Sequence, residues 1–195
     1  MKIGVFGGSF NPVHRGHFEI VKQVLQTGKV DQVIVMPVYQ NPLKKALPAL
    51  PEQLRREMLE ATFSSLTGVQ ISDFELQTHE VSYTYKTLEH LHTLLPEDQL
   101  YLMMGEDSFS HFSLWKEYER ILSLSRLLVF RRPEASKQVL DSVQETYTAE
   151  WAEVVIPAIS STAIRNSDLE TVKKNNWLHP NALDSWQQYL DSPLY

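Results

Sequence analysis

The sequence predicts an α/β protein that begins with a βαβ unit. The apolar stretch Lys2–Phe6 passes through a glycine turn into apolar residues at helical spacing, and this helix ends near Gly28. Residues 33–38 then form a continuous apolar run, which is typical of a strand buried on both faces of a parallel sheet. Strand, helix and strand in this order indicate a crossover between two parallel strands.

Strands and helices alternate along the rest of the chain. Residues 52–66 have apolar side chains at helical spacing, and a second such pattern predicts a helix that begins near Tyr83 or Thr84. Short apolar runs predict the other strands, at residues 69–71, 100–104, 127–130 and 154–156. We expect a further helix at Val139–Val143 and two or three short closing helices, with a helix start at His179–Pro180.

Length, charge and composition limit the class of protein. The 195 residues suit one domain, residues 1–195, with a C-terminal helical part from about residue 160. The net charge of −6 argues against a broad nucleic-acid surface, and no apolar stretch approaches the ~20 residues that cross a bilayer. There is no cysteine for a disulfide, and no signal-peptide pattern precedes the first strand. We therefore expect a cytoplasmic protein with a small ligand, no nucleic acid and no membrane, and we leave its oligomeric state open.

The segment Gly7–His17 is the most informative part of the chain. Its paired glycines leave main-chain N–H groups open to a phosphate, and the helix that follows aims its positive dipole end at the same place. His14 and His17 are three residues apart, so their rings share a face if both lie in the first turn. The segment is neither a Walker loop nor a dinucleotide Gly-x-Gly-x-x-Gly motif. It predicts an anion site, although such glycines can serve packing alone and such histidines can simply cap a helix.

Other residues with suitable chemistry follow predicted strands or begin predicted helices. Each also has an ordinary explanation. Lys44 can be a solvated loop charge, Thr84, Asp107 and the hydroxyls of Ser160–Thr162 can be helix caps, and Trp115 can fill the core.

With these blocks together, the sequence resembles the bacterial nicotinate-nucleotide adenylyltransferases of the nucleotidylyltransferase superfamily over almost its whole length. The family pattern GG(S/T)FDPxHxGH occurs at Gly7–His17, with Asn11 in place of the usual Asp. Leu43 stands where the family often has a His, and Asn166-Ser167 replace a common Glu-Arg pair. The other matching blocks are Asn41–Lys45, Ser82–Thr84, Met104–Trp115, Arg131–Pro133 and Ile159–Arg165.

This resemblance implies a doubly wound parallel sheet of five to six strands, the Rossmann-like nucleotidyltransferase fold, with a small C-terminal helical segment. It implies adenylyl transfer from ATP to nicotinate mononucleotide in NAD biosynthesis, with Mg²⁺ carried by ATP and no metal held by protein side chains. The implied catalytic residues are His14 and His17. ATP would be bound by Gly7, Gly8, Ser9, Phe10, His14, His17, Lys44, Gly105, Asp107, Ser161, Thr162 and Arg165. The mononucleotide would be bound by Ser9, Tyr83, Thr84, Trp115 and Arg132.

Three alternatives stay open at this point. Phosphopantetheine adenylyltransferases share the first and last blocks but lack the Ser-Tyr-Thr and Gly-x-Asp-Ser pair. An enzyme that prefers nicotinamide mononucleotide differs only in how it recognises the pyridine substituent. A non-catalytic nucleotide sensor would keep the glycine loop, but the presence of both His14 and His17 argues against it.

Overall fold

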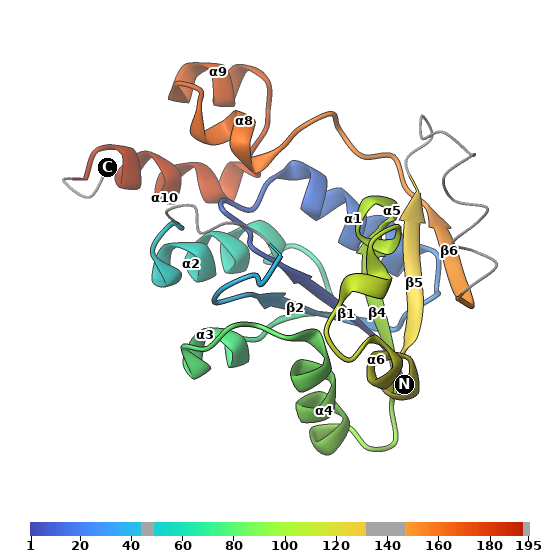
Figure 1. Ribbon diagram of the computed structural model, residues 1–195. Coiled ribbons are helices and arrows are strands. Elements are labelled where there is room, and N and C mark those ends of the chain that lie inside the picture. The colour runs from blue at the N-terminus through green and yellow to red at the C-terminus, as the bar shows by residue number, and fades with distance from the viewer. Residues whose placement is uncertain (44–48, 132–146, 193–195) are drawn as a thin grey trace.

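The computed structural model describes residues 1–43, 49–131 and 147–192. Six parallel strands form one sheet in the order β3-β2-β1-β4-β5-β6 (Figure 1). The chain builds outward from β1 to β3, then returns to the other side of β1 to start β4, which confirms the doubly wound fold. The strands are β1 (Lys2–Gly8), β2 (Gln32–Pro37), β3 (Val69–Ile71), β4 (Gln99–Gly105), β5 (Arg126–Arg131) and β6 (Ala149–Glu153).

Helices connect the strands and follow the last one. Between β1 and β6 lie α1 (Arg15–Gln26), α2 (Glu52–Phe63), α3 (Phe74–Thr78), α4 (Thr84–Leu94), α5 (Glu106–Phe109), the 3-10 turn η1 (Phe112–Leu114) and α6 (Tyr118–Leu124). Three short helices close the described chain, as predicted: α8 (Ser161–Arg165), α9 (Leu169–Lys174) and α10 (Pro180–Leu190). The helix predicted at Val139–Val143 lies outside the described residues.

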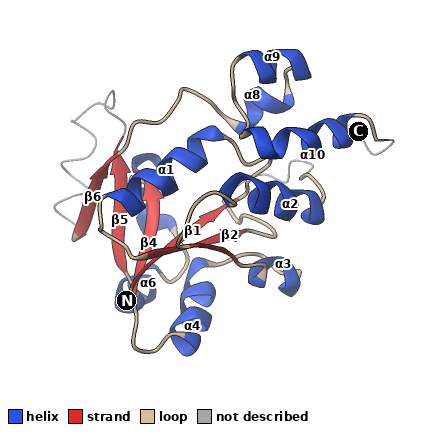
Figure 2. Cartoon of the chain, turned by 180° about the vertical axis from the view of Figure 1, so that it is seen from behind, coloured by secondary structure: helices blue, strands red, loops and turns tan. Residues whose placement is uncertain are grey.

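The sheet is covered on both faces, which explains why its central strands are apolar at nearly every position. Alternate side chains such as Val33 and Val35 pack with α1, α2 and α10, whereas Ile34 and Met36 pack with α4 and α6. Figures 1 and 2 show these two helical layers on opposite sides of the sheet. None of the helices described has the length and apolar character needed to span a membrane.

The sequence prediction of the sixth strand at residues 154–156 is wrong. The strand is Ala149–Glu153, at the sheet edge, where only part of each side chain is buried and the composition is correspondingly mixed. The apolar run belongs to the connection that leaves the sheet, with Val155 69% exposed. That connection is fixed to α1 by a pair of hydrogen bonds, since Gln23 donates to the Val155 carbonyl and accepts from the Val155 N–H, both at 2.9 Å.

Candidate active site

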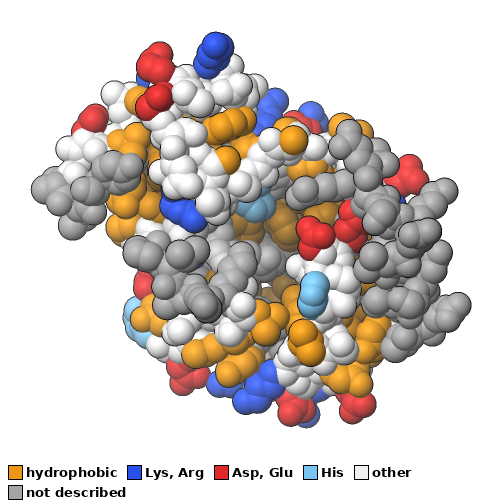
Figure 3. All heavy atoms as spheres, turned by 45° about the horizontal axis from the view of Figure 1, so that its top comes forward, with side chains coloured by type: hydrophobic (Ala, Val, Ile, Leu, Met, Phe, Trp, Pro, Cys, Tyr) orange, Lys and Arg blue, Asp and Glu red, His pale blue; other side chains and the backbone are white. Residues whose placement is uncertain are grey.

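A cavity of about 820 Å³ opens where the carboxyl ends of β1 and β4 diverge. This is the point at which the strand order reverses, and the volume is typical of a ligand site. The space-filling view in Figure 3 shows a hollow in this face, with a histidine and basic side chains among hydrophobic ones. Every predicted site residue that the structure describes lines the cavity: Gly7, Gly8, Ser9, Phe10, His14, His17, Tyr83, Thr84, Gly105, Asp107, Trp115, Ser161, Thr162 and Arg165. The predicted residues Lys44 and Arg132 lie outside the described residues.

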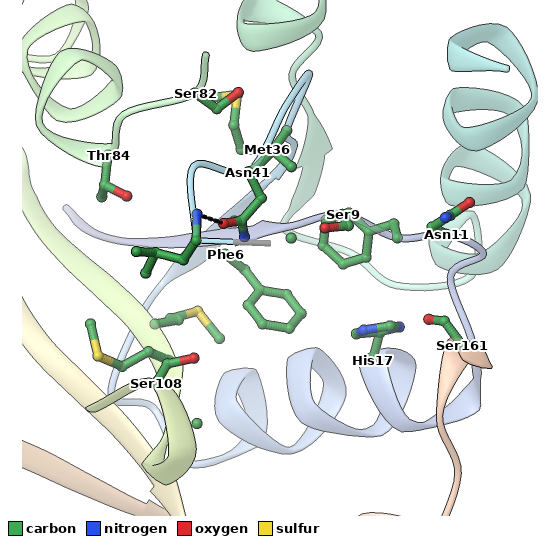
Figure 4. A pocket seen from close by; sticks show the side chains of 18 of the residues that line it. Phe6, Ser9, Asn11, His17, Met36, Asn41, Ser82, Thr84, Ser108 and Ser161 are labelled. Carbon is green, nitrogen blue, oxygen red and sulfur yellow. Dashed lines mark hydrogen bonds between the residues drawn. The ribbon is translucent and has the colours of Figure 1, made fainter. Parts of the chain in front are cut away.

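The two histidines lie together at the start of α1. His14 is the N-cap residue and His17 is in the first turn, and their rings stack with centroids 3.7 Å apart. The backbone N–H of His14 donates to Nδ1 of His17 at 3.1 Å. An imidazole whose Nδ1 accepts a hydrogen bond carries its single proton on Nε2, so His17 presents an Nε2–H donor. In Figure 4 the His17 ring projects from α1 into the cavity, close to Ser161.

The paired glycines differ in their surroundings. A Cβ at Gly8 would lie 2.9 Å from Cζ of Phe10, because the Phe10 ring packs against this backbone. The same ring makes an edge contact with His17, with centroids 5.0 Å apart. A Cβ at Gly7 would meet no atom within 4 Å. The space beside Gly7 is therefore open to the cavity, whereas Gly8 makes room for Phe10.

The loop after β1 is held by side chains from other elements, which we call the loop clamps: Arg55, Ser161 and Arg165. Arg55 donates to the Ser9 carbonyl at 3.1 Å and Ser161 donates to the Pro12 carbonyl at 2.8 Å. Arg165 donates to the Asn11 carbonyl. In this structure, the hydroxyl and guanidinium predicted to hold ATP phosphates thus also position the loop.

Asn11 explains why the family's usual Asp can be replaced here. Its side-chain oxygen accepts a hydrogen bond from the N–H of Leu50 at 2.8 Å, and its surroundings are buried. A carboxylate and an amide both supply that acceptor oxygen, so the contact does not require a charge.

The other end of the cavity is formed by the start of α4 and by Trp115. Tyr83 is the N-cap residue, and the first N–H groups of α4 have no acceptor within the helix, as at every helix start. Ser82 ties this start to the β2 exit, because its hydroxyl accepts from Tyr39 N–H at 2.9 Å. The ammonium of Lys116 lies 4.6 Å from the centre of the Tyr83 ring. Figure 4 shows Thr84 far across the cavity from His17, so the site is long enough for two groups side by side.

Sequence reasoning missed two buried ionisable residues in the cavity wall. Arg55 shares a helix face with the apolar Met58 and Leu59, and an arginine at such a position signals a special role. Burial lowers the pKa of its guanidinium, and the Glu52 carboxylate opposes that effect. Burial also raises the pKa of Glu75, an effect that hydrogen bonds from Thr87 and Ser82 reduce.

Comparison with known proteins identifies the class and then the family. Residues 5–167 match the family model described as cytidylyltransferase-like. Relatives include a probable nicotinate-nucleotide adenylyltransferase of Clostridium perfringens, strain 13, 32% identical over 194 residues and 96% of both chains. Another from Bacteroides thetaiotaomicron is 34% identical over 97% of this chain and 93% of the relative. The chain belongs to the nicotinate-nucleotide adenylyltransferase family, within the cytidylyltransferase-like proteins.

A solved structure supports the fold. The Plasmodium falciparum nicotinic acid mononucleotide adenylyltransferase, complexed with NaAD, superimposes with a TM-score of 0.77. The alignment covers 96% of this chain and 95% of that one, at 19% sequence identity. At this identity the likeness concerns the architecture of the sheet and its helices.

Proposed function

We propose that this protein transfers the adenylyl group of ATP to nicotinate mononucleotide, giving nicotinate adenine dinucleotide and pyrophosphate. The observation that supports this best is the single cavity that joins the His14–His17 pair to the start of α4 and Trp115. One end suits phosphates, the other suits a flat ring with a negative substituent, and family membership agrees with both.

The chain need not supply a nucleophile. A phosphate oxygen of the mononucleotide attacks the α-phosphorus of ATP, a new P–O bond forms, and the bond between that phosphorus and the oxygen of pyrophosphate breaks. Negative charge spreads over the oxygens of the transferred group, where the Nε2–H of His17 and the backbone at Gly7 donate. The loop clamps keep these donors in place, and we assign Ser161, Thr162 and Arg165 to the β- and γ-phosphates and Gly105 and Asp107 to the ribose of ATP.

Magnesium enters this proposal as part of the ATP substrate. The described residues contain no group of three or more His, Asp or Glu side chains arranged to hold a metal ion. Mg²⁺ binds readily to phosphate oxygens and keeps several waters, so it requires no protein cage. Cytoplasmic location stays a prediction.

The acceptor is assigned as the acid, because the pyridine end of the cavity is positive. The dipole of α4 and the nearby Lys116 ammonium both favour a carboxylate, and the first N–H groups of α4 can donate to it. A neutral amide would lose charge-assisted bonds, which predicts discrimination of about 1.5–3 kcal/mol.

Incubation with Mg-ATP and each acceptor, followed by pyrophosphate release, tests the assignment. We expect turnover with nicotinate mononucleotide, much less with nicotinamide mononucleotide and none with phosphopantetheine. Equal efficiency with the acid and the amide would contradict the assignment of the acceptor, and no turnover with either would contradict the proposed reaction.

The variant Thr84→Pro tests where the carboxylate is recognised. Thr84 is the first residue of α4, where proline is accepted, and Tyr83 has φ −109° and ψ 121°, which suits a residue before proline. The change therefore removes one N–H without breaking the helix. We expect the preference for the acid to fall in Thr84→Pro and to persist in the control Thr84→Ala, and an unchanged preference in both would place recognition elsewhere.

A further inference from the structure

Arg55 is a buried cation that has no ion-pair partner among the described residues, although the partly exposed Glu52 carboxylate acts on it electrostatically. Its side chain is in α2, is 2% exposed and lines the cavity. It forms no ion pair within the described ranges, and Nη1 alone donates, to the carbonyls of Ser9 and Val38 at 3.1 and 2.7 Å. The buried Nε has no hydrogen-bond partner among the residues described.

Holding two carbonyl groups does not explain a full positive charge. A neutral donor could bridge the Ser9 and Val38 carbonyls, whereas burying a guanidinium is energetically unfavourable unless an anion compensates its charge. The neighbouring Arg56 shows the ordinary arrangement, with ion pairs to Glu60 and Asp73 at the surface. The lack of an ion pair to Arg55 among the described residues is therefore the feature that needs an explanation.

Glu75, a buried acid of the cavity wall, forms no ion pair with Arg55. Glu75 is 6% exposed and its carboxyl group accepts a hydrogen bond from Thr87; burial raises its pKa, an effect that this hydrogen bond opposes. Although the protein has a net charge of −6, the cavity thus has one buried positive charge, that of Arg55, beside the loop after β1.

We infer that Arg55 compensates the charge of the mononucleotide's phosphate and so makes this site select a phosphorylated acceptor. The inference rests on the proposed function. Arg55 lies on the side of β2, where its second acceptor, Val38, leads to the segment tied to Ser82 and the start of α4. That is the end assigned to the mononucleotide, whereas the groups assigned to the ribose and to the β- and γ-phosphates of ATP are in β4, α5 and α8.

A thermodynamic cycle between Arg55 and the phosphate isolates this effect. Calorimetry would measure the binding of nicotinate mononucleotide and of nicotinate riboside, which differ only in the phosphate, to the wild type and to variants. Arg55→Gln removes the charge and keeps an N–H donor for the carbonyls. Arg55→Met is a second neutral variant, Arg55→Lys keeps the charge, and Arg56→Met is the matched surface control. Circular dichroism would first establish that each variant is folded.

We expect Arg55→Gln to weaken nucleotide binding by on the order of tenfold to a hundredfold, as for a lost charge-assisted contact, with little change for the riboside. Arg55→Lys should recover most of this loss, and Arg56→Met should match the wild type. Equal weakening of both ligands would overturn the inference and leave Arg55 as a structural clamp, and so would a loss confined to ATP. If the wild type neither binds nor adenylylates the mononucleotide, the proposed function fails together with the inference. If the wild type turns over the mononucleotide but the Arg55 variants weaken both ligands equally, only the role of Arg55 is removed.

Discussion

Gly16→Ala should separate catalysis from stability, because Gly16 is packed against the histidine pair. A Cβ at this position would lie 3.0 Å from both Cε1 and Nδ1 of the His14 ring and 3.1 Å from Cγ2 of Ile156. Such contacts are a few tenths of an ångström too close for comfortable packing. His14 cannot simply withdraw toward His17, since their rings already stack at 3.7 Å.

Helix propensity and overpacking affect the stability of Gly16→Ala in opposite directions. Alanine is favoured over glycine in a helix by about 1 kcal/mol, and overpacking of a tight site costs about 1–3 kcal/mol. The free energy of unfolding should therefore fall by no more than about 2 kcal/mol. A shift of about 1 Å in a catalytic group costs on the order of a hundredfold in rate, so the smaller shift expected at His17 should lower kcat by on the order of tenfold.

Urea denaturation and steady-state pyrophosphate release would measure the two quantities on the same preparation. Gly28→Ala is the control with the opposite expectation. Gly28 has φ +66° and no atom within 4 Å of a built Cβ, so alanine there costs about 1–2 kcal/mol of backbone strain and leaves kcat unchanged. A wild-type kcat in Gly16→Ala, or a similar loss in Gly28→Ala, would refute this reasoning.

Three other substitutions have distinct expected outcomes. His17→Ala should lower kcat by on the order of 10²–10³ while ATP affinity measured by calorimetry barely changes, because its donor acts mainly in the transition state; equal losses in both would make it a binding residue. Gly7→Ala should leave the urea midpoint unchanged and weaken nucleotide binding, since its Cβ would occupy only the open cavity; unweakened binding would show that no ligand approaches there. Burial holds the pKa of Glu75 above its unfolded value, so the contribution of Glu75 to stability is largest below that unfolded pKa and is lost as pH rises through the folded pKa. Glu75→Gln keeps an acceptor for Thr87 and should gain stability over the wild type as urea midpoints are followed upward from pH 4 to 8; a constant difference would contradict this.

The sequence was sufficient for the parallel core because central strands such as β2 are buried on both faces and are therefore apolar at successive positions. The sequence was insufficient for β6. This strand pairs only with β5 and is partly buried, so it can contain Trp151 and two glutamates. Residues 154–156 lie after the last strand, and they are apolar because Val154 and Ile156 pack on the core beside α1. Apolar composition indicates burial, and burial alone does not distinguish an edge strand from a packed connection.

The candidate site was predictable as a group of residues and not as a set of contacts. Loops at the carboxyl ends of parallel strands meet at one edge of the sheet, which is why residues from Gly7 to Arg165 line one cavity. The partners of the clamps have no local pattern, since Ser161 reaches the Pro12 carbonyl across 149 positions and Arg165 reaches Asn11 across 154. Arg55 could have been noticed, because it interrupts an apolar helix face.

These distant contacts also explain how an acidic protein can offer its backbone to phosphates. A loop presents carbonyl oxygens as well as N–H groups, and an unsatisfied carbonyl would repel a phosphate oxygen as both are acceptors. Here the carbonyls of Ser9, Asn11 and Pro12 already accept hydrogen bonds from the loop clamps. In the peptides that follow Ser9 and Pro12, the C=O and the N–H point in opposite directions, so holding these two carbonyls also fixes the direction of the N–H groups of Phe10 and Val13. The peptide between Asn11 and Pro12 has no N–H, so Arg165 only anchors the loop there. The loop clamps thus make the loop a donor surface, and the charge of two of them adds positive potential where the net charge of the chain would oppose anion binding.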